Sequence, residues 1–245
     1  MIVRTFETGE EVARALAARV ASALRDRPAL VLGLPTGRTP VRTYGELRRL
    51  HAAGAVSFAG ATTFNLDEFV GVDGAHPGSF RQFMERHLFG GVDLRPDRIH
   101  FLDGLAPDPD AECRRYERDI EAAGGIGLQL LGIGANGHIG FNEPAPELAA
   151  STHRVTLHAG TRRDNAALFG GDPERVPREA LSMGMGTILK AEAIVLLATG
   201  ARKATCVERT VRGPVTTTLP ASFLQLHRRV ELYLDRAAAA LLPVE

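Results

Sequence analysis

Short apolar runs alternate along the chain with longer stretches in which apolar residues recur every three or four positions. Several of the short runs are apolar almost throughout, a pattern typical of parallel strands covered on both faces. The runs that we predict as strands span residues 29–33, 62–66, 99–102, 127–133, 194–199 and 230–234. Because strands and helices alternate, the pattern predicts an α/β fold with a doubly wound, mainly parallel sheet and helices on both faces.

The longer stretches have the spacing of amphipathic helices. Residues 8–25 open with a capping box formed by Thr8 and Glu11, and apolar residues then follow at every fourth position. Further helices are predicted over residues 108–123 and 201–211. One helix therefore precedes the first strand, which is expected to begin near residue 29.

No repeat, low-complexity tract or linker rich in Gly, Pro or Ser divides the 245 residues. We therefore predict a single Rossmann-like domain over residues 1–245. Lys and Arg together number 29, and so do Asp and Glu. This balance argues against a nucleic acid or an anionic membrane as a partner.

The two cysteines, Cys113 and Cys206, stand far apart and lack the spacing of a metal-ligand pair. Two such thiols suit a reducing compartment. Charged residues among positions 1–11 do not fit the apolar core of a signal peptide, and the longest apolar stretches are far too short to span a membrane. We therefore expect a cytoplasmic protein with no membrane segment.

In a parallel sheet of this kind, ligands bind beyond the carboxyl ends of the strands. The first loop at such a position spans residues 32–40, where a glycine turn leads into a helix that Thr39 would cap and Pro40 would begin. Free backbone N–H groups at such a turn favour a phosphate. Arg38 stands where a Walker loop has lysine, and the glycine spacing also differs from that motif. A plain tight turn is the alternative.

Asp67 and Glu68 are adjacent carboxylates at the end of a strand that is expected to be buried. Charges at that position are costly unless they are solvated or used, and a base for proton transfer belongs there. A solvated loop explains the pair nearly as well, and the sequence leaves both interpretations open.

A glycine-rich loop has the Gly-x-Gly-x-x-Gly spacing of dinucleotide-binding loops at residues 132–137. Its context does not fit that motif, because Pro144 and other loop-forming residues follow where a helix is required. Instead, His138 lies five residues before Glu143 in the same loop. A histidine that a carboxylate can orient is suited to proton transfer near neutral pH.

A last loop, residues 182–190, precedes the strand that ends near Thr199, and Lys203 follows close to the start of a helix. A lysine at that edge of a sheet can offset the charge of a phosphate. A solvated surface lysine is the ordinary alternative.

Together these loops resemble the glucosamine-6-phosphate deaminase family, in the wider group that includes the 6-phosphogluconolactonases. The likeness runs from the first strand to about His227. The matching segments are Pro-Thr-Gly-x-Thr-Pro at 35–40, Asn-x-Asp-Glu at 65–68, Gly-His-Ile-Gly-Phe-Asn-Glu-Pro at 137–144, Gly-x-Gly-Thr at 184–187 and Leu-Gln-Leu-His at 224–227. The run at 137–144 is the most specific, because lactonases of the group typically have Gly-His-Thr there, followed by a serine-bearing stretch.

The resemblance implies an enzyme that deaminates and isomerises glucosamine 6-phosphate to fructose 6-phosphate and ammonia. It assigns opening of the sugar ring to His138, which Glu143 would hold, and proton transfer from C2 to C1 to Asp67. It implies no metal and no organic cofactor. The site residues that it implies are Asp67, Asn136, His138 and Glu143 for catalysis, and Gly37, Arg38, Thr39, Glu68, Gly137 and Lys203 for binding of the substrate and its phosphate.

Three positions depart from the pattern of the family. Asn136 stands where relatives often have Asp, although Asn occurs there too. Ala167 stands where an arginine usually contacts the phosphate, and Arg38 replaces the usual second glycine of the phosphate loop. The alternatives are another enzyme on this scaffold, such as a different hexosamine-phosphate isomerase or a lactonase, and a non-catalytic sugar-phosphate sensor. A monomer or a small homo-oligomer is expected.

Overall fold

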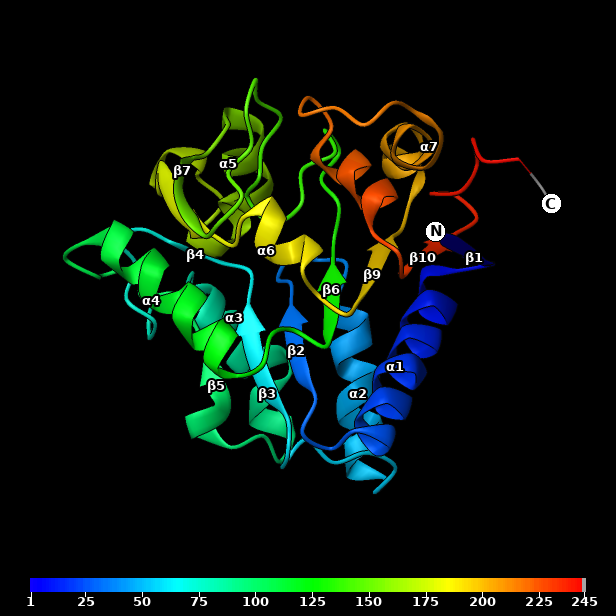
Figure 1. The fold of residues 1–245 in the computed structure, drawn as a ribbon, viewed down its shortest axis with the longest axis horizontal. Coiled ribbons are helices and arrows are strands. Elements are labelled where there is room, and N and C mark those ends of the chain that lie inside the picture. The colour runs from blue at the N-terminus through cyan, green and yellow to red at the C-terminus, as the bar shows by residue number, and fades with distance from the viewer. Residues whose placement is uncertain (244–245) are drawn as a thin grey trace.

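A parallel sheet of seven strands forms the centre of the computed structural model, which describes residues 1–243 (Figure 1). The strand order is β1-β10-β9-β6-β2-β3-β5, and every neighbouring pair is parallel. The strands are β1 (Ile2–Phe6), β2 (Val31–Leu34), β3 (Thr62–Asn65), β5 (Ile99–His100), β6 (Leu128–Leu131), β9 (Ala193–Ala198) and β10 (Val230–Asp235). The prediction of a mainly parallel α/β sheet is confirmed, and all six predicted strands are present.

Strand β1 lies at one edge of this sheet, and its place contradicts the expectation that the first strand begins near residue 29. It pairs in parallel with β10, so that Ile2 lies opposite Glu231 and Phe6 lies opposite Asp235. The first four of its five side chains are exposed. Its sequence, Ile-Val-Arg-Thr-Phe, shows neither the continuous apolar run nor the alternation of apolar and polar residues that marks a strand. Pairing with β10 is what places it in the sheet.

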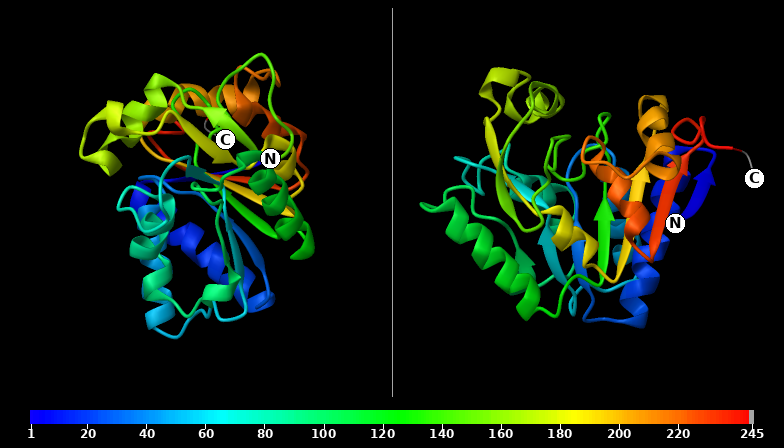
Figure 2. Two further views of the ribbon diagram at one scale, coloured as in Figure 1. Left: turned by 90° about the vertical axis from the view of Figure 1, so that its left-hand side faces the viewer. Right: turned by 45° about the horizontal axis from the view of Figure 1, so that its top comes forward.

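Helices cover both faces of the sheet, as predicted (Figure 2). The side chains of α1, α2 and α3 pack in an apolar core on one face, and those of α4, α6 and α7 pack in a second core on the other. The helices are α1 (Gly9–Asp26), α2 (Val41–Ala52), α3 (Phe80–His87), α4 (Pro109–Ala122), α5 (Ala159–Asn165), α6 (Met185–Leu189) and α7 (Ala204–Arg212), with 3-10 turns at Phe89–Gly91, Pro96–Arg98, Ala166–Phe169, Pro173–Arg175, Ala201–Lys203 and Pro220–Leu226. Within residues 1–243, none of these helices is long and apolar enough to cross a membrane.

The sequence predicts how two helices begin, and the structure confirms one of these starts. Thr8 caps α1, because its Oγ1 accepts the backbone N–H of Glu11 at 3.2 Å. The carboxylate of Glu11 accepts the N–H of Glu7 at 3.0 Å, one residue before the partner that a capping box requires. The prediction for α2 is wrong by one residue: Pro40, and not Thr39, holds the cap position, and no side chain caps it.

A second, antiparallel sheet is absent from the prediction. Its strands are β4 (Asp67–Phe69), β8 (Glu179–Ser182) and β7 (His153–Thr156), in the order β4-β8-β7. It lies beyond the carboxyl ends of the large sheet's strands (Figure 1). Its strands are too short to give a clear apolar pattern. The residues Asp67 and Glu68 are only 6% and 2% exposed in this sheet, so the interpretation of the pair as a solvated loop is wrong.

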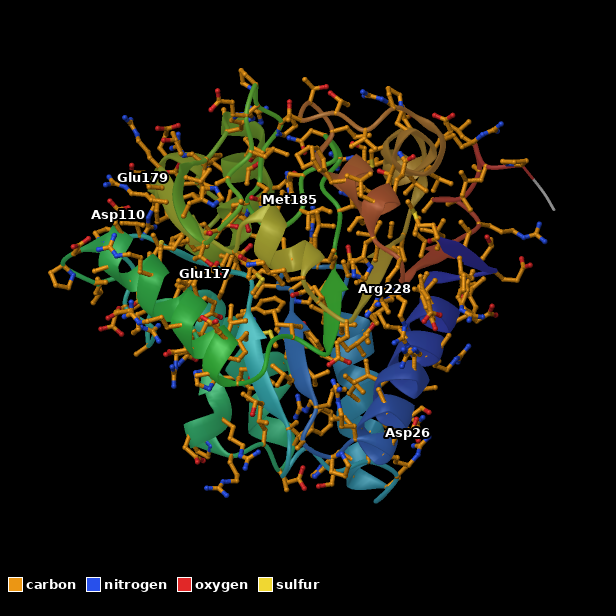
Figure 3. The ribbon with its side chains drawn as sticks, viewed as in Figure 1. Asp26, Asp110, Glu117, Glu179, Met185 and Arg228 are labelled. Atoms are coloured by element: carbon orange, nitrogen blue, oxygen red, sulfur yellow. The ribbon has the colours of Figure 1, made fainter. Side chains whose placement is uncertain are left out.

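Glu117 on α4 joins the motif at residues 184–187 to the rest of the structure. Its Oε1 accepts hydrogen bonds from the Thr187 hydroxyl and from the backbone N–H of Thr152, each at 2.6 Å. These bonds tie α4 to α6, which begins at Met185 (Figure 3). The threonine of this motif therefore has a packing role.

Gly33 on β2 is a position where the sheet leaves no room for a side chain. A Cβ there would lie 2.1 Å from Oε1 of Gln129, which is fully buried on the neighbouring strand β6. We expect Gly33→Ala to lower the free energy of unfolding by about 1–3 kcal/mol, the usual cost of overpacking a core.

Gly45→Ala is the matched control, because Gly45 lies within α2 and nothing lies within 4 Å of its Cβ position. Alanine there should raise the free energy of unfolding by about 0.5–1 kcal/mol, since it restricts the unfolded chain. Denaturant unfolding of the two variants measures both effects. A Gly33→Ala protein as stable as the wild type would contradict the close packing of β2 on Gln129.

Candidate active site

The loops that carry the candidate residues meet at one edge of the large sheet. They follow β2, β3, β6 and β9, which are neighbours in the order β9-β6-β2-β3 and run in the same direction. Because parallel strands end at the same edge, loops that are far apart in the sequence come together there (Figure 1). Open α/β sheets bind ligands at this edge, where the strand order reverses, and here the reversal lies between β2 and β6.

Asp67 begins β4, directly beyond the end of β3, and pairs with Ser182 on β8. The glycine-rich loop passes close to its carboxyl group, because a Cβ on Gly140 would lie 3.4 Å from its Oδ2. Burial raises the pKa of Asp67 to about 8, and the charge of Glu68 adds to the rise. Once ionised, Asp67 is therefore a stronger base than a carboxylate in water.

Glu68 faces away from Asp67, since neighbouring residues of a strand point to opposite sides. Its carboxylate accepts the backbone N–H groups of Phe69, Phe80 and Arg81 at distances of 2.9 Å, 3.0 Å and 3.1 Å. Burial raises the pKa of Glu68 to about 7, although these hydrogen bonds act in the opposite direction. Two of the three donors, Phe80 and Arg81, belong to the first turn of α3. Glu68 therefore bonds this helix, and none of its donors is another residue of the predicted site.

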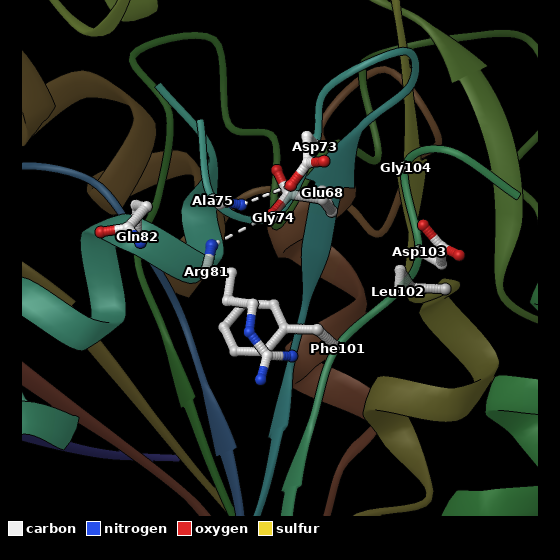
Figure 4. Close-up of a pocket in the computed structure, with 10 residues that line it drawn as sticks. All are labelled: Glu68, Asp73, Gly74, Ala75, Arg81, Gln82, Phe101, Leu102, Asp103 and Gly104. Carbon is white, nitrogen blue, oxygen red and sulfur yellow. Dashed lines mark hydrogen bonds between the residues drawn. The ribbon is translucent and has the colours of Figure 1, made fainter. Parts of the chain in front are cut away.

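The side chain of Glu68 borders a separate hollow of about 490 Å³ (Figure 4). The other side chains around it come from α3 and from the segments on either side of it, and include Asp73, Phe101 and Asp103. Arg81 lies over the ring of Phe101, with 5.6 Å between its guanidinium carbon and the ring centre. Asp67 and Glu68 therefore serve different regions of the molecule, although they are adjacent in the sequence.

His138 lies with its ring against the backbone of Gly134. A Cβ on Gly134 would lie 2.4 Å from the ring, so this glycine is needed to accommodate the histidine. The Nδ1 atom lies 3.4 Å from Oε2 of Glu143, and the backbone N–H of His138 donates to Oδ1 of Asn136 at 3.2 Å. Because Nδ1 faces Glu143, Nε2 is the ring nitrogen left for a substrate.

The chain after this loop contains no helix from residue 139 to residue 152. The Gly-x-Gly-x-x-Gly spacing therefore lacks the helix N-terminus on which a dinucleotide pyrophosphate would sit. Gly137 donates its N–H to the carbonyl of Gly134 and accepts the N–H of Ala221, both at 3.0 Å. The backbone N–H and carbonyl of Gly137 thus have partners inside the protein, and its contact with substrate stays a prediction.

The carboxylate of Glu143 is surrounded by four polar side chains, and its own side chain is only 4% exposed. Its Oε2 accepts Nδ2 of Asn136 at 2.9 Å and lies 3.4 Å and 3.6 Å from the Nδ1 atoms of His138 and His158, while Oε1 accepts the hydroxyl of Thr161. Burial by itself raises the pKa of Glu143, but His138, Thr161 and Asn136 outweigh it and lower the pKa to about 2. Glu143 is therefore ionised throughout the neutral range.

Thr161 and His158 are the contacts of this carboxylate that the sequence-based prediction missed. Thr161 lies on α5 and His158 directly precedes that helix, in a segment that follows a strand of the small sheet. The prediction relied on loops that follow parallel strands, and that rule does not reach this segment. No local signal in the sequence marks them, because His158 stands before α5 in extended backbone and both residues meet Glu143 only when this segment packs on the glycine-rich loop.

Gly37, Arg38 and Thr39 form the turn between β2 and α2. Gly37 has φ +98°, and nothing lies within 4 Å of its Cβ position, so the turn is open on that side. The side chain of Arg38 is exposed and that of Thr39 is half-buried. Ala167, at the position where the family pattern has an arginine, is exposed on the 3-10 turn that follows α5.

Lys203 is half-buried at the end of the loop that follows β9. Burial lowers the pKa of Lys203, and the nearby charges of Arg202 and Arg38 lower it further, whereas Asp164 acts in the opposite direction. Three cationic side chains therefore lie close enough to interact at this end of the site. Within residues 1–243, no group of three or more His, Cys, Asp and Glu side chains is arranged to hold a metal ion.

A family model described as glucosamine-6-phosphate isomerases/6-phosphogluconolactonase matches residues 5–233. The chain belongs to this family. The glucosamine-6-phosphate deaminase of Rhodopirellula baltica is 50% identical over 233 residues, which are 95% of this chain and 92% of that protein. The glucosamine-6-phosphate deaminase of Thermoanaerobacter sp. (strain X514) is 44% identical over 236 residues, 96% of this chain and 93% of that protein.

Solved structures of the family divide into near and distant neighbours. One described as a monomeric glucosamine-6-phosphate deaminase is 42% identical, has a TM-score of 0.95 and covers 98% of this chain and 100% of its own. The 6-phosphogluconolactonase from Thermotoga maritima has a TM-score of 0.75 over 96% of this chain and 98% of its own, but is only 17% identical, so that likeness shows the fold alone.

Asp67 should destabilise the folded protein as the pH rises. Its pKa increases from 3.8 to about 8 on folding, so between these values the folded protein binds a proton that the unfolded chain has released, and stability falls with increasing pH. Asp67→Asn removes this penalty. One pKa unit corresponds to about 1.36 kcal/mol, so even half of the rise would make the variant about 3 kcal/mol more stable than the wild type near pH 8.

Denaturant unfolding of both proteins near pH 5 and near pH 8 measures this effect. The gain in stability of Asp67→Asn should be larger at the higher pH. An equal gain at both pH values would mean that the carboxyl of Asp67 is not the group that titrates in this range.

Proposed function

We propose that this protein converts glucosamine 6-phosphate and water to fructose 6-phosphate and ammonia. The observation that carries the proposal is the pairing of two proton-transfer groups at one edge of the sheet. The buried base Asp67 lies against Gly140, in the loop whose His138 faces the ionised carboxylate of Glu143. An aldose-ketose isomerisation needs both groups, one for ring opening and one for transfer of a proton between carbons.

The first step is opening of the pyranose ring by His138. The Nε2 atom takes the proton of the anomeric hydroxyl and delivers it to the ring oxygen as the bond between C1 and that oxygen breaks. Glu143 lies beside Nδ1, so it holds the imidazole in one orientation and stabilises the imidazolium that forms during the transfer. Asn136 contributes by bonding both the carboxylate of Glu143 and the backbone of His138.

The second step is proton transfer by Asp67. The carboxylate removes the proton from C2 of the open-chain sugar, which leaves an enolamine across C1 and C2 with its negative charge on O1. Asp67 then returns the proton to C1, and O1 takes a proton from the nitrogen as the imine forms at C2. The imine takes up water and releases ammonia, which leaves the ketone. The burial that raises the pKa of Asp67 to about 8 increases its strength as a base.

The phosphate lies, in this proposal, at the turn formed by Gly37, Arg38 and Thr39. The open side of Gly37 allows the anion to approach the backbone N–H groups of the turn. Lys203, which interacts with the charge of Arg38, supplies a positive charge from the loop after β9. In this arrangement the phosphate group lies at one end of the sugar, and Asp67 and His138 act on C1 and C2 at the other end.

A lactone hydrolase and a non-catalytic sugar-phosphate sensor are the competing functions. Sequence identity favours the deaminases, because the named deaminases are 44–50% identical to this chain, whereas the lactonase neighbour is 17% identical. A buried carboxyl with a strongly raised pKa is costly to keep and is typical of a catalytic group, which favours an enzyme over a sensor.

We further propose that residues 1–245 act as one catalytic domain that works in the cytoplasm without metal or organic cofactor. The family match over residues 5–233 supports a single domain. The relative described as monomeric supports a monomer, although a small homo-oligomer would also fit the proposal. Size-exclusion chromatography with light scattering distinguishes the two states.

An ammonia-release assay on a panel of hexosamine 6-phosphates tests the function, with 6-phosphogluconolactone as the competing substrate. The wild type should release ammonia from glucosamine 6-phosphate. Asp67→Asn should lower kcat by about 10²- to 10⁴-fold, the usual contribution of a positioned general base. The KM should change little, because the lost interaction belongs to the transition state.

Asp73→Asn is the control, since Asp73 borders the separate hollow beside Glu68. It should leave kcat and KM near the wild-type values. Hydrolysis of the lactone without ammonia release would replace the proposed function, and normal turnover by folded Asp67→Asn would remove its mechanism.

Arg38 should compensate for the arginine that Ala167 replaces. A hydrogen bond to a charged group contributes about 1.5–3 kcal/mol, so Arg38→Gly should raise KM by roughly 10- to 150-fold. Adding Ala167→Arg to that variant should restore part of the loss, because it returns a cation from the opposite side. Arg25→Ala serves as the control, because the guanidinium of Arg25 donates to the backbone carbonyl of Ala55. An unchanged KM in Arg38→Gly would leave Lys203 and the backbone of the turn as the phosphate contacts.

A further inference from the structure

His158 directly precedes α5 and lies within reach of the buried carboxylate of Glu143. Its Nδ1 lies 3.6 Å from Oε2, while 54% of its side chain remains exposed. Its backbone carbonyl accepts the N–H of Arg162 at 3.0 Å, so the residue holds the cap position of α5. The side chain makes no capping hydrogen bond, and the buried carboxylate is the charged group that it meets.

Thr161, three residues further on, contacts the other oxygen of the same carboxylate. Its hydroxyl donates to Oε1 of Glu143. Thr161 is the third residue of α5 and His158 is its N-cap residue, so the start of α5 contacts both oxygens of Glu143 at once. The start of α5 therefore lies against the carboxylate of Glu143, and the charge of Asp164 on the same helix acts on Lys203.

We propose that His158 is a positioning residue, which together with Thr161 anchors α5 on Glu143 and so fixes one wall of the substrate site. The proposal rests on the function proposed above and assigns His158 no contact with the reacting atoms. Orientation of His138 does not depend on it, because Asn136 bonds Glu143 at 2.9 Å and the ring of His138 packs on Gly134. Loss of His158 should therefore weaken binding of substrate and leave the chemical steps unchanged.

Steady-state kinetics of His158→Ala and His158→Asn test the proposal. The contact is half-exposed, and even fully charged pairs at exposed positions have small effects, so His158→Ala should raise KM by roughly 2- to 5-fold and leave kcat within about 2-fold. The amide of asparagine can donate from nearly the same place as Nδ1, so His158→Asn should recover most of the wild-type KM. The same order of affinities should appear for an unreactive open-chain hexitol 6-phosphate, measured by calorimetry.

A second comparison uses Thr161→Val, which removes the other contact. Because both contacts hold α5 on the same carboxylate, their effects should not be independent, and the double variant should raise the dissociation constant of the hexitol phosphate by more than the product of the two single effects. His87→Ala is the control, because His87 lies on α3 and packs against Phe83. It should leave both KM and affinity unchanged.

The proposal would be overturned by an unchanged KM in His158→Ala, by a fall in kcat at constant KM, or by a double variant that shows only the product of the single effects. An asparagine variant as weak as the alanine variant would also contradict it, since the donor would then not matter. These results can be distinguished from failure of the proposed function, in which the wild type itself would release no ammonia from glucosamine 6-phosphate.

Discussion

The negative charge of Glu143, held almost without water, is the interaction on which the site depends. A buried carboxylate is stable only when donors surround it. Glu143 takes two of its partners, Asn136 and His138, from its own loop, and two, Thr161 and His158, from the region of α5. The same charge therefore orients the imidazole and holds a distant segment at the carboxyl ends of the strands.

Three buried carboxyl groups in this protein show how the surroundings decide what one functional group does. Donors outweigh burial at Glu143 and lower its pKa to about 2. At Asp67 burial dominates and raises the pKa to about 8, which suits a base that must hold and return a proton. Glu68 is committed to three backbone N–H groups near α3. The surroundings thus make Glu143 a fixed charge, suit Asp67 to the proton transfer that we propose, and give Glu68 backbone donors as partners.

The buried carboxyl of Asp67 lowers the stability of the folded protein. A carboxyl that is protonated in the folded state and ionised in the unfolded chain reduces the free energy of unfolding as the pH rises. The large sheet can carry such a cost, because two apolar cores flank it, one on each face. Buried groups with strongly raised pKa values are characteristic of active sites, where stability and chemistry make opposite demands.

The sequence alone determined six strands of the large sheet, the helices α1, α4 and α7, the presence of a helix after residue 39, and the loops that follow these strands. Apolar runs and helical periodicity are local patterns, and parallel strands place their loops at one edge whatever the details. Local patterns also gave the candidate pair of His138 and Glu143. Only the tertiary structure decided that Asp67 and Glu68 face different regions, because that depends on the pairing of β4 with β8. It also added β1, which is held by pairing with β10 and not by burial. Contacts from α5 to Glu143 arise from segments that are distant along the chain, so no local pattern of residues contains them.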